Sequence, residues 1–446
     1  MTRAAERLGA GRRRIAVIGT GISGLLAARL LHTRHDVTVF EAEARIGGHT
    51  HTVDVEVAGK PYAIDTGFIV FNERNYPGFV QLLTHLGVES QPTTMSFSVH
   101  CERTRLEYCG TSLNQLFAQR RNLLRPSFWG MIRDILRFQR AAEPLLASAA
   151  DPSLGEVLQR GRYGRAFVDH YLVPMAAAIW SAEPQSILAM PARFLIRFFQ
   201  HHGMLQVDGR PQWRTITGGS RSYLAPLAAP FRDRVQLAQP VQGVVRTQNG
   251  VRVEVAGHDL REFDAVVLAT HSDQALRLLR DASADERSVL AAVRYQQNDV
   301  VLHTDERLLP DRKLAWAAWN YRLPLQAQER VAVSYCMNHL QGLPSAAERP
   351  GHPTFVVTLN QTSAIDPARI LRKFVYDHPI FDRAAVSAQQ RLPALQGSGR
   401  VWFCGAWCGN GFHEDGVQSA LAVTQDYDLS LRHLGASTPP SAEIAS

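Results

Sequence analysis

Lysine is almost missing from this sequence of 446 residues, which contains only Lys60, Lys313 and Lys373. The net charge of +7 therefore comes almost entirely from arginine. The arginines are scattered and form no run typical of a nucleic-acid-binding module, so we expect no nucleic-acid partner. An anionic membrane surface or an acidic substrate remains compatible with the positive charge.

Cysteine is also scarce, and long apolar runs are absent. The five cysteines are an odd number without the paired spacing of zinc sites, which predicts a reducing compartment and no disulfide framework. No run of about 18 apolar residues occurs, so we expect no membrane span. The basic N-terminus leads into an apolar strand without the apolar core of a secretion signal. These absences predict a cytoplasmic protein, with peripheral contact at the inner membrane left open.

The chain opens with a βαβ pattern. Residues 14–20, RIAVIGT, form a short apolar run typical of a buried parallel strand. Apolar residues at helical spacing follow through Leu31, and residues 36–41, DVTVFE, indicate a second strand. The length exceeds that of a usual single domain, so we expect a second domain as well.

The turn between the first strand and the helix carries Gly19, Gly21 and Gly24 at GxGxxG spacing. These glycines permit a tight turn, close approach of a pyrophosphate and close helix–strand packing, and the helix N-terminus attracts phosphates. Glu41 ends the second strand, where a carboxylate would accept the ribose hydroxyls. The pattern predicts dinucleotide binding by Gly19, Gly21, Ile22, Ser23, Gly24, Glu41 and Ala42.

The continuation, ARIGGHTHTV, decides between dinucleotides. Arg45, Gly47 and Gly48 follow the second strand directly. This arrangement resembles the extended fingerprint of the flavin amine oxidase and phytoene desaturase superfamily, in which the arginine and the glycine pair line the FAD pyrophosphate and approach the isoalloxazine. The resemblance implies FAD as cofactor. It also implies an α/β, Rossmann-like FAD-binding domain interleaved with an α+β substrate domain, as in amine oxidases.

Later segments are similar to the same superfamily. Residues 52–65 alternate as a hairpin would, and Thr66 and Gly67 follow it, while Gly218-Gly219 resembles the glycine pair that returns the chain to the FAD domain. Residues 401–422 resemble the C-terminal flavin motif, with a helix expected to start near Gly416 and Ala406 where the family usually has Asp. The resemblance implies further cofactor contacts from His49, Thr66, Gly67, Val241, Ala269, Thr270, Gly405, Ala406, Gly416 and Val417.

Three stretches, GGHTHT, DTGFIVFNERNYP and GFHEDG, are most similar to a bacterial subgroup of FAD-binding proteins and to the N-terminal half of plant cyclopropane fatty acid synthases. That subgroup is associated with modification of fatty acyl chains in phospholipids, including a dehydrogenation towards furan fatty acids. The resemblance therefore implies a lipid substrate and a lipid methyltransferase as a partner.

The expected division assigns residues 12–92, 211–290 and 398–434 to the FAD-binding domain, and residues 93–210 and 291–397 to the substrate domain. Residues 435–446 are expected to form a disordered tail. Residues 117–146 suggest a mostly helical, amphipathic stretch flanked by arginines, either a membrane-contacting surface or a core helix with a solvated face. Residues 193–205 suit an apolar tunnel or ordinary core packing equally well.

His49 and His51 admit three interpretations: a wall of the flavin site, structural hydrogen bonding, or a metal site. Alternation on a strand would place both on one face. The flavin-wall interpretation is favoured for His49, and we expect no metal. His413, Glu414 and Asp415 are candidates to accept or steer a proton. His413 and Asp415 could instead cap the final helix.

We expect an FAD-dependent oxidoreductase that oxidises a methylated or unsaturated fatty acyl chain by hydride transfer to flavin N5, with His49, His413 and Asp415 as candidate catalytic residues. An amine oxidase acting on a small amine is the second hypothesis. Many members of that family use a lysine-bound water, which Lys313 would have to hold here. The third is a non-redox FAD-binding accessory of a lipid methyltransferase.

Overall fold

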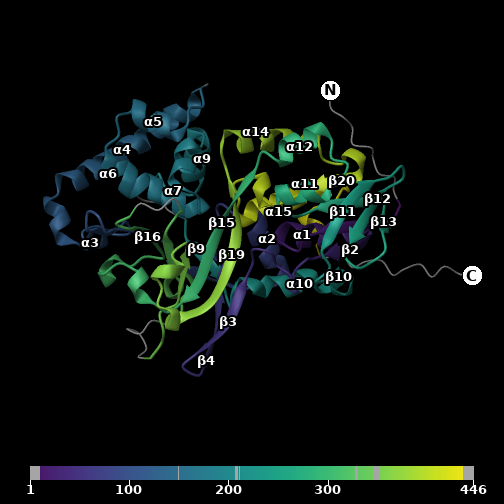
Figure 1. Ribbon diagram of the computed structural model, residues 1–446, viewed down its shortest axis with the longest axis horizontal. Helices are drawn as coiled ribbons and strands as arrows, with labels where there is room; N and C mark the ends of the chain where they lie inside the picture. Colours follow the sequence, from purple (N-terminus) through teal and green to yellow (C-terminus); the bar gives the residue numbers. More distant parts are fainter. Residues whose placement is uncertain are drawn as a thin grey trace, which may run out of the picture.

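The computed structural model describes residues 11–148, 150–205, 209, 211–326, 330–344 and 351–434. The molecule is elongated, with a parallel sheet and its helices at one end and a larger sheet with a group of helices at the other (Figure 1). The predicted tail, 435–446, lies outside the described residues.

A five-stranded parallel sheet has the order β10-β2-β1-β14-β20. It contains β1 (Arg14–Ile18), β2 (Asp36–Phe40), β10 (Val235–Gln236), β14 (Ala265–Leu268) and β20 (Val401–Phe403). Helices α1 (Ile22–Leu31) and α15 (His413–Gln425) pack against each other beside this sheet. β1 and β14 are buried almost completely, as expected for central parallel strands. The Rossmann-like α/β prediction is confirmed.

A second layer covers the other face of the parallel sheet. It contains the antiparallel strands β11 (Val241–Arg246), β12 (Val251–Val255) and β13 (Arg261–Phe263), with α11 (Ser272–Leu278) and α12 (Ala284–Leu290). Helix α14 (Arg383–Arg391) joins the same core through Ala385 and Ala388. The sequence assigns residues 383–395 to the substrate domain, but their apolar side chains pack here instead, because α14 lies against α12.

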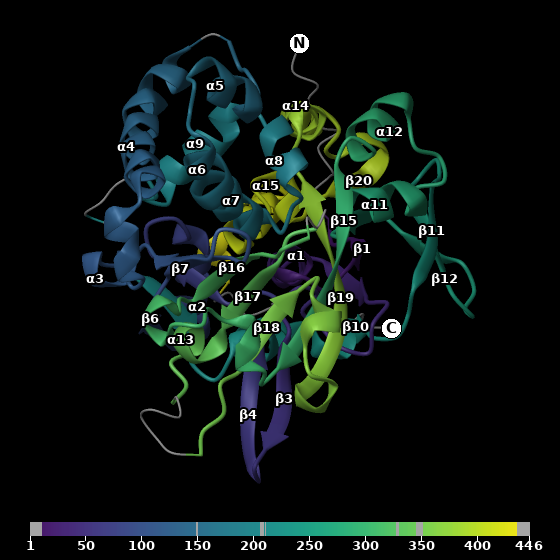
Figure 2. The ribbon, with the colours of Figure 1, turned by 60° about the vertical axis from the view of Figure 1, so that its left-hand side comes forward.

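A seven-stranded mixed sheet has the order β19-β15-β18-β17-β16-β7-β8. Its long strands β15 and β19 run through the middle of the molecule, between the helices at one end and the parallel sheet at the other (Figures 1 and 2). The strands are β7 (Phe97–Cys101), β8 (Leu106–Cys109), β15 (Arg294–His303), β16 (Trp319–Leu323), β17 (Val333–Cys336), β18 (Val356–Leu359) and β19 (Ile370–Ile380).

Short elements connect the two parts. The predicted hairpin forms as β3 (Thr52–Val57) and β4 (Lys60–Asp65) and extends from the body of the molecule (Figure 2). A small sheet joins β5 (Val70–Asn72), β9 (Trp213–Ile216) and β6 (Ser90–Thr93). The connecting helices are α2 (Pro77–Leu86), α10 (Leu224–Ala228) and α13 (Met337–Gln341).

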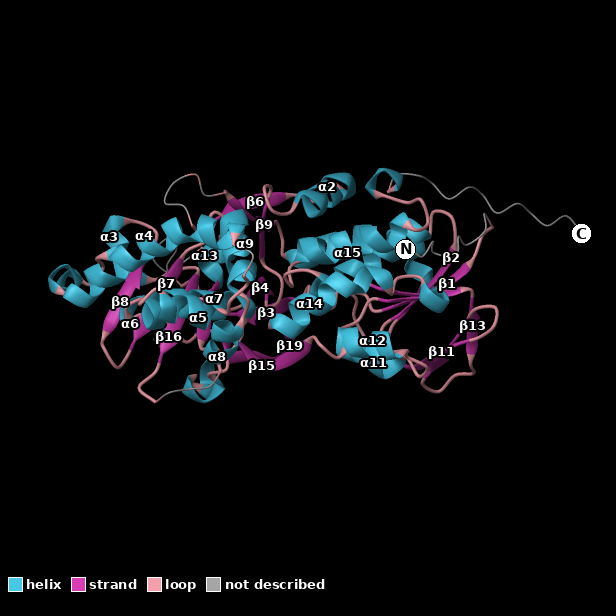
Figure 3. Ribbon diagram, turned by 90° about the horizontal axis from the view of Figure 1, so that it is seen from above, coloured by secondary structure: helices cyan, strands magenta, loops and turns pink. Residues whose placement is uncertain are grey.

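The far end of the molecule is helical (Figure 3). It contains α3 (Leu113–Leu116), η1 (Arg120–Leu124), α4 (Pro126–Ala147), α5 (Leu154–Arg160), α6 (Arg165–Phe167), η2 (Val168–Leu172), α7 (Val173–Trp180), α8 (Pro184–Ala189) and α9 (Ala192–His201). Residues 117–146 are thus not one helix, because Pro126 starts α4 and holds Arg125 in an extended conformation. Among the described residues, no helix is both long and apolar enough to cross a membrane.

Candidate active site

The glycine turn after β1 is shaped to receive a dinucleotide. A Cβ on Gly19 would lie 2.6 Å from the carbonyl oxygen of Ala269, and one on Gly24 would lie 2.0 Å from that of Gly19. Both positions therefore require glycine. At Gly21, the N-cap of α1, a Cβ would meet no atom within 4 Å, so this backbone is open to an approaching phosphate.

The second glycine pair packs onto this turn. The Gly47 N–H donates to the carbonyl of Thr20 at 3.0 Å, and a Cβ on Gly48 would lie 3.1 Å from the Cα of Gly21. Arg45 sits beside them, half-buried, and donates to the carbonyl of Thr50. The two motifs of the fingerprint thus form one cradle, which fits the pyrophosphate of FAD.

Glu41 follows β2 at the edge of the cradle. Its carboxylate accepts hydrogen bonds from the backbone N–H and hydroxyl of Thr20 and from the N–H of Glu43. A carboxylate has about four acceptor positions, so capacity remains for a ribose hydroxyl. Ala42 is exposed beside it. Gln239 N–H donates to the Glu41 carbonyl and brings the segment before Val241 alongside.

The C-terminal motif, residues 401–422, forms the other side of the cradle. A Cβ on Gly416 would lie 2.7 Å from Ile22 and 3.0 Å from Ser23, so this glycine lets α15 approach α1. The indole of Trp407 donates to the Thr270 carbonyl, which ties the Gly405–Ala406 turn to the end of β14. Ala406 adds no polar side chain there. The helix begins at His413, three residues before the expected start at Gly416, and Val417 is buried within it.

Asp415 and Glu414 have capping roles. The Asp415 carboxylate accepts the Phe412 N–H at 2.9 Å, and burial raises its pKa to about 6. Glu414 accepts the N–H groups of Gly78 and Phe79 at the start of α2. Neither carboxyl group lines the apolar cavity described below. The structure supports the capping alternative for Asp415.

His413 is buried in a hydrogen-bonded network rather than capping the helix. Its ring stacks on Phe68 at a centroid distance of 3.5 Å, and its Nε2 lies 3.0 Å from the Thr50 hydroxyl and 3.1 Å from the Tyr223 hydroxyl. Burial lowers its pKa to about 3. His413 is therefore neutral at pH 7.

His49 lies in the turn between Gly48 and β3, so the predicted placement of His49 and His51 on one strand face is wrong. Both rings nevertheless meet β19. The Nε2 atoms of His49 and His378 are 3.4 Å apart, and His51 Nδ1 lies 2.7 Å from the Tyr376 hydroxyl, which also contacts Thr66 at 2.7 Å. The N–H of Phe68, next to Gly67, donates to the His49 carbonyl.

These histidines are uncharged at neutral pH. The His49 ring is accessible from the cavity, and its desolvation by the protein around the cavity, aided by repulsion from His378 and His413, lowers its pKa well below the usual value. Burial lowers the pKa values of His378 and His51 to about 4. An imidazole of this kind can accept a proton from a bound molecule and release it readily.

A cavity of about 290 Å³ lies against His49, Tyr376, His378 and His413. Thirteen of the side chains that line it are Phe, Tyr or Trp: Phe68, Tyr76, Phe97, Tyr108, Tyr171, Trp180, Phe198, Trp213, Trp319, Tyr335, Tyr376, Phe381 and Phe412. Phe198 comes from the stretch 193–205, which favours the tunnel interpretation over core packing alone for that residue. Among the described residues, no Asp, Glu, Lys or Arg side chain lines the cavity.

Sequence analysis did not identify Tyr376, His378 or Asn298 at this site. Asn298 Nδ2 on β15 lies 2.9 Å from His378 Nδ1 on β19. In the register of these two strands, Asn298 pairs with Tyr376 and His378 pairs with Gln296. Phe374, Tyr376 and His378 alternate on one face of β19. That period-two pattern of rings is the signal that could have identified the strand.

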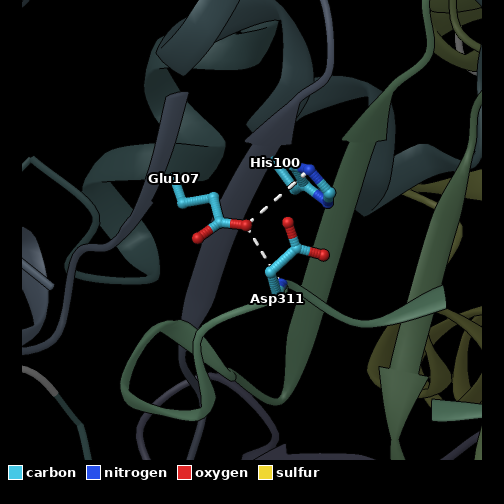
Figure 4. A group of neighbouring side chains, drawn as sticks. All are labelled: His100, Glu107 and Asp311. Atoms are coloured by element: carbon cyan, nitrogen blue, oxygen red, sulfur yellow. Dashed lines mark hydrogen bonds and ion pairs between the residues drawn. The ribbon is translucent and has the colours of Figure 1, made fainter. Parts of the chain in front are cut away.

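A group of side chains that could bind a metal ion lies away from the cavity. Among the described residues, His100, Glu107 and Asp311 could offer three ligand atoms (Figure 4). Buried Glu107 already accepts the Asp311 N–H at 3.0 Å and the Arg312 guanidinium at 2.8 Å. Each oxygen of the carboxylate thus already has a hydrogen-bond partner, and the group anchors the loop before η6 (Lys313–Ala315). None of the three residues lines the cavity beside His49.

Comparison with known proteins agrees with this site. Residues 22–378 match the family described as flavin containing amine oxidoreductase. AofH of Mycobacterium tuberculosis, a protein named as a flavin-containing monoamine oxidase, is 28% identical over 255 residues, which cover 54% of this chain and 53% of AofH. The match therefore spans about half the length of that relative.

Two solved structures share the fold over nearly the whole chain. Cyclohexylamine oxidase from Brevibacterium oxydans IH-35A has a TM-score of 0.66 and 16% identity, covering 94% of this chain and all of its own. A CLA-producing fatty acid isomerase from P. acnes has a TM-score of 0.64 and 16% identity, covering 93% and 98%. The chain belongs to the flavin containing amine oxidoreductase family.

Proposed function

We propose that the protein oxidises a fatty acyl chain, methylated or unsaturated, with FAD as the hydride acceptor. The observation that carries this proposal is the lining of the cavity, which is aromatic and aliphatic and, in the described part of the chain, holds no charged side chain. An acyl chain has no charge to neutralise and gains from burial against such a surface.

A small amine fits this cavity poorly. Alkylamines are ammonium ions at neutral pH, and a buried ammonium requires a charged or polar partner. The histidines of the wall are neutral, so they offer a hydrogen-bond acceptor but no negative charge to an ammonium group. All three lysines are described, and none lines the cavity: Lys60 is in the β3–β4 hairpin, Lys373 is exposed on β19, and Lys313 lies 5.3 Å from the Trp316 ring. Lys313 therefore cannot hold a water at the reacting atoms.

FAD, the aromatic wall and His49 have separate roles in this reaction. FAD, when bound, supplies the acceptor for a hydride. The aromatic wall holds the acyl chain and excludes water. Formation of a carbon–carbon double bond also releases a proton. Nε2 of His49 can take it up by giving up its 3.4 Å contact with His378 Nε2, because this ring directly follows the glycine pair that meets Gly21. Because the pKa of His49 is lowered, the ring readily releases the proton again.

The test is anaerobic spectrophotometry of the FAD-loaded protein. Phospholipid with cyclopropane, methylated or unsaturated acyl chains would be added in one series and a panel of alkyl and aryl amines in another. We expect the flavin to bleach with the acyl substrates alone, and the product to contain one more double bond by mass spectrometry. Bleaching by an amine would overturn the acyl assignment. A flavin that no donor reduces would favour the accessory role beside a lipid methyltransferase.

A further inference from the structure

Helix α3 and the neighbouring start of α4 lie at the end of the molecule opposite the parallel sheet (Figures 1 and 3), and large apolar side chains are exposed there. Leu113 on α3 is 76% exposed and Leu124 on η1 is 87% exposed, with Leu123 at 47% and Trp129 at 49%. Four exposed large apolar residues within 17 positions are unusual, since soluble surfaces scatter such residues singly.

Arginines without carboxylate partners surround these residues. Among the described residues, Arg103, Arg105, Arg120, Arg121 and Arg125 form no ion pair, and no Asp or Glu occurs between Tyr108 and Arg133. Their guanidinium groups bond only to carbonyl and amide oxygens, as Arg120 does with Asn114 and Arg125 with Thr104. The five arginines and four apolar residues are called the docking face below.

The docking face is held rigid. The Trp129 indole donates to the Leu123 carbonyl at 2.9 Å, and Arg120 bonds to Asn114 and to the Phe117 carbonyl, so α3, η1 and the start of α4 form one unit. Arg312 donates to Glu107 at 2.8 Å and so fixes the start of η6. Helix η6 packs against α3 and exposes Leu314. A rigid apolar surface loses little conformational entropy on binding.

A pocket of about 380 Å³ adjoins this face. Arg103, Arg125 and Arg165 line it together with Leu106, Phe128 and Met131. Asp169 also lines the pocket and forms an ion pair with Arg165 at 3.5 Å, which leaves Arg103 and Arg125 as the lining arginines without an ion pair. Guanidinium groups recognise phosphate oxygens, and an apolar floor accommodates the glycerol and upper acyl segments of a lipid. This combination matches the headgroup region of a phospholipid.

The pocket lies next to the acyl cavity. Tyr108 lines the cavity and Phe128 lines the pocket, and their rings meet edge to face with centroids 5.7 Å apart. Gly110 and Thr111 also line the cavity and directly precede the exposed end of α3. The pocket and the cavity therefore share a wall at Tyr108 and Phe128.

We propose that the docking face binds the surface of a bilayer that contains anionic phospholipid, with a lipid phosphate held by Arg103 and Arg125. The docking face does not extend along the whole amphipathic stretch predicted at 117–146. Arg137 of α4 donates to Asp134 and to the Gly161 carbonyl, so it is not available to a membrane. Contact is confined to α3, η1, the first turn of α4 and the turn between β7 and β8 that carries Arg103 and Arg105. Only the choice of lipid as occupant rests on the proposed function.

The test is sedimentation of the FAD-loaded full chain with vesicles of phosphatidylglycerol and phosphatidylcholine at equal parts, against vesicles of phosphatidylcholine alone. We expect binding to the anionic vesicles that weakens at 0.5 M salt. Arg120→Gln with Arg121→Gln should weaken binding roughly thirtyfold, since each basic residue near such a surface contributes about 1 kcal/mol. Leu113→Ser with Leu124→Ser should weaken it about tenfold or more.

Matched controls come from the other end of the molecule. Leu260 is 61% exposed between β12 and β13, and Arg287 is exposed on α12. Leu260→Ser and Arg287→Gln should bind anionic vesicles as the unmodified protein does. Equal binding by the docking-face variants and these controls, or no binding to anionic vesicles, would overturn the proposal. Sedimentation involves no turnover, so a failure of acyl oxidation leaves its result unaffected.

Discussion

Asn298 determines which nitrogen of His378 carries the proton. Its Nδ2 lies 2.9 Å from His378 Nδ1 and 3.2 Å from the Gln296 carbonyl, while its Oδ1 accepts from Asn360. Because Asn360 Oδ1 in turn accepts the Asp299 N–H, the two amides have defined orientations. His378 Nδ1 is therefore an acceptor and Nε2 carries the hydrogen, which points toward His49 Nε2.

Asn298→Asp should charge His378. A carboxylate beside Nδ1 favours the imidazolium form, so the pKa of His378 should rise from about 4 toward or above the usual value of about 6.5. A positive His378 repels a proton at His49, and we expect flavin reduction to slow about tenfold at pH 7. Nitrogen-15 NMR of labelled histidines measures the pKa directly. Asn298→Ala removes the donor without adding charge, and an equal pKa rise in that variant would contradict this account.

Gly21→Ala should weaken FAD binding without changing the stability of the apoprotein. The added methyl meets no protein atom within 4 Å, and the backbone φ of −62° suits alanine, so the apoprotein should keep its melting temperature. The methyl would occupy the approach of the pyrophosphate, so FAD affinity should fall at least about tenfold. Titration of the apoprotein with FAD, followed by flavin fluorescence, measures the affinity.

Gly130→Ala is the matched control, because this glycine in α4 also has no neighbour within 4 Å of an added Cβ. It should leave FAD affinity unchanged and stabilise the protein by about 0.5–1 kcal/mol, as alanine does within a helix. Equal FAD affinity in both variants would mean that Gly21 does not face the cofactor.

The parts of the site that are contiguous in sequence could be predicted from it. The turn at Gly19–Gly24 and the Gly47–Gly48 pair have spacings that follow from local backbone requirements, so the cradle was identifiable without a structure. The start of α15 was missed by three residues, although Asp415 three positions after Phe412 is a capping pattern.

The wall of the cavity that β19 contributes could not be predicted in the same way. His378 reaches His49 from 329 positions away because β19 and β15 cross the middle of the molecule, and no local pattern specifies that pairing. The break before α4 was foreseeable, since the residue before a proline avoids the helical conformation. The docking face depends on that break, which turns η1 outward from the axis of α4.

Removing all three lysines tests the amine oxidase alternative. Lys60→Met, Lys313→Met and Lys373→Met combined should leave the rate of anaerobic flavin reduction by substrate within about twofold, since exposed substitutions change stability little and none of the three lysines lines the cavity. Stopped-flow absorbance gives the rate. A loss of a hundredfold or more in the Lys313→Met single variant would restore the lysine-bound water mechanism.

His303 should contribute to acid sensitivity. It is fully buried in β15, where its Nδ1 accepts the Asp305 N–H at 3.0 Å and its Nε2 lies 2.7 Å from the Thr358 hydroxyl. Burial lowers its pKa to about 4, partly offset by Asp305. Between pH 6.5 and 4 the unfolded chain binds a proton here that the folded chain does not. The free energy of unfolding therefore falls with falling pH by about 1.4 kcal/mol per pH unit at most from this residue.

His303→Asn isolates that contribution. Asparagine keeps an acceptor for the Asp305 N–H but has no group that titrates in this range. The variant should be less stable than the unmodified protein at pH 7, because a buried hydrogen bond is lost, and its stability should then decline less steeply toward pH 4.5. Asp65 and Asp415, whose raised pKa values act in the opposite sense, are present in both proteins and cancel in the difference. Urea unfolding at pH 7, 5.5 and 4.5 gives the free energy of unfolding of both proteins as a function of pH. An equal decline in the two proteins would show that His303 does not contribute to the acid sensitivity.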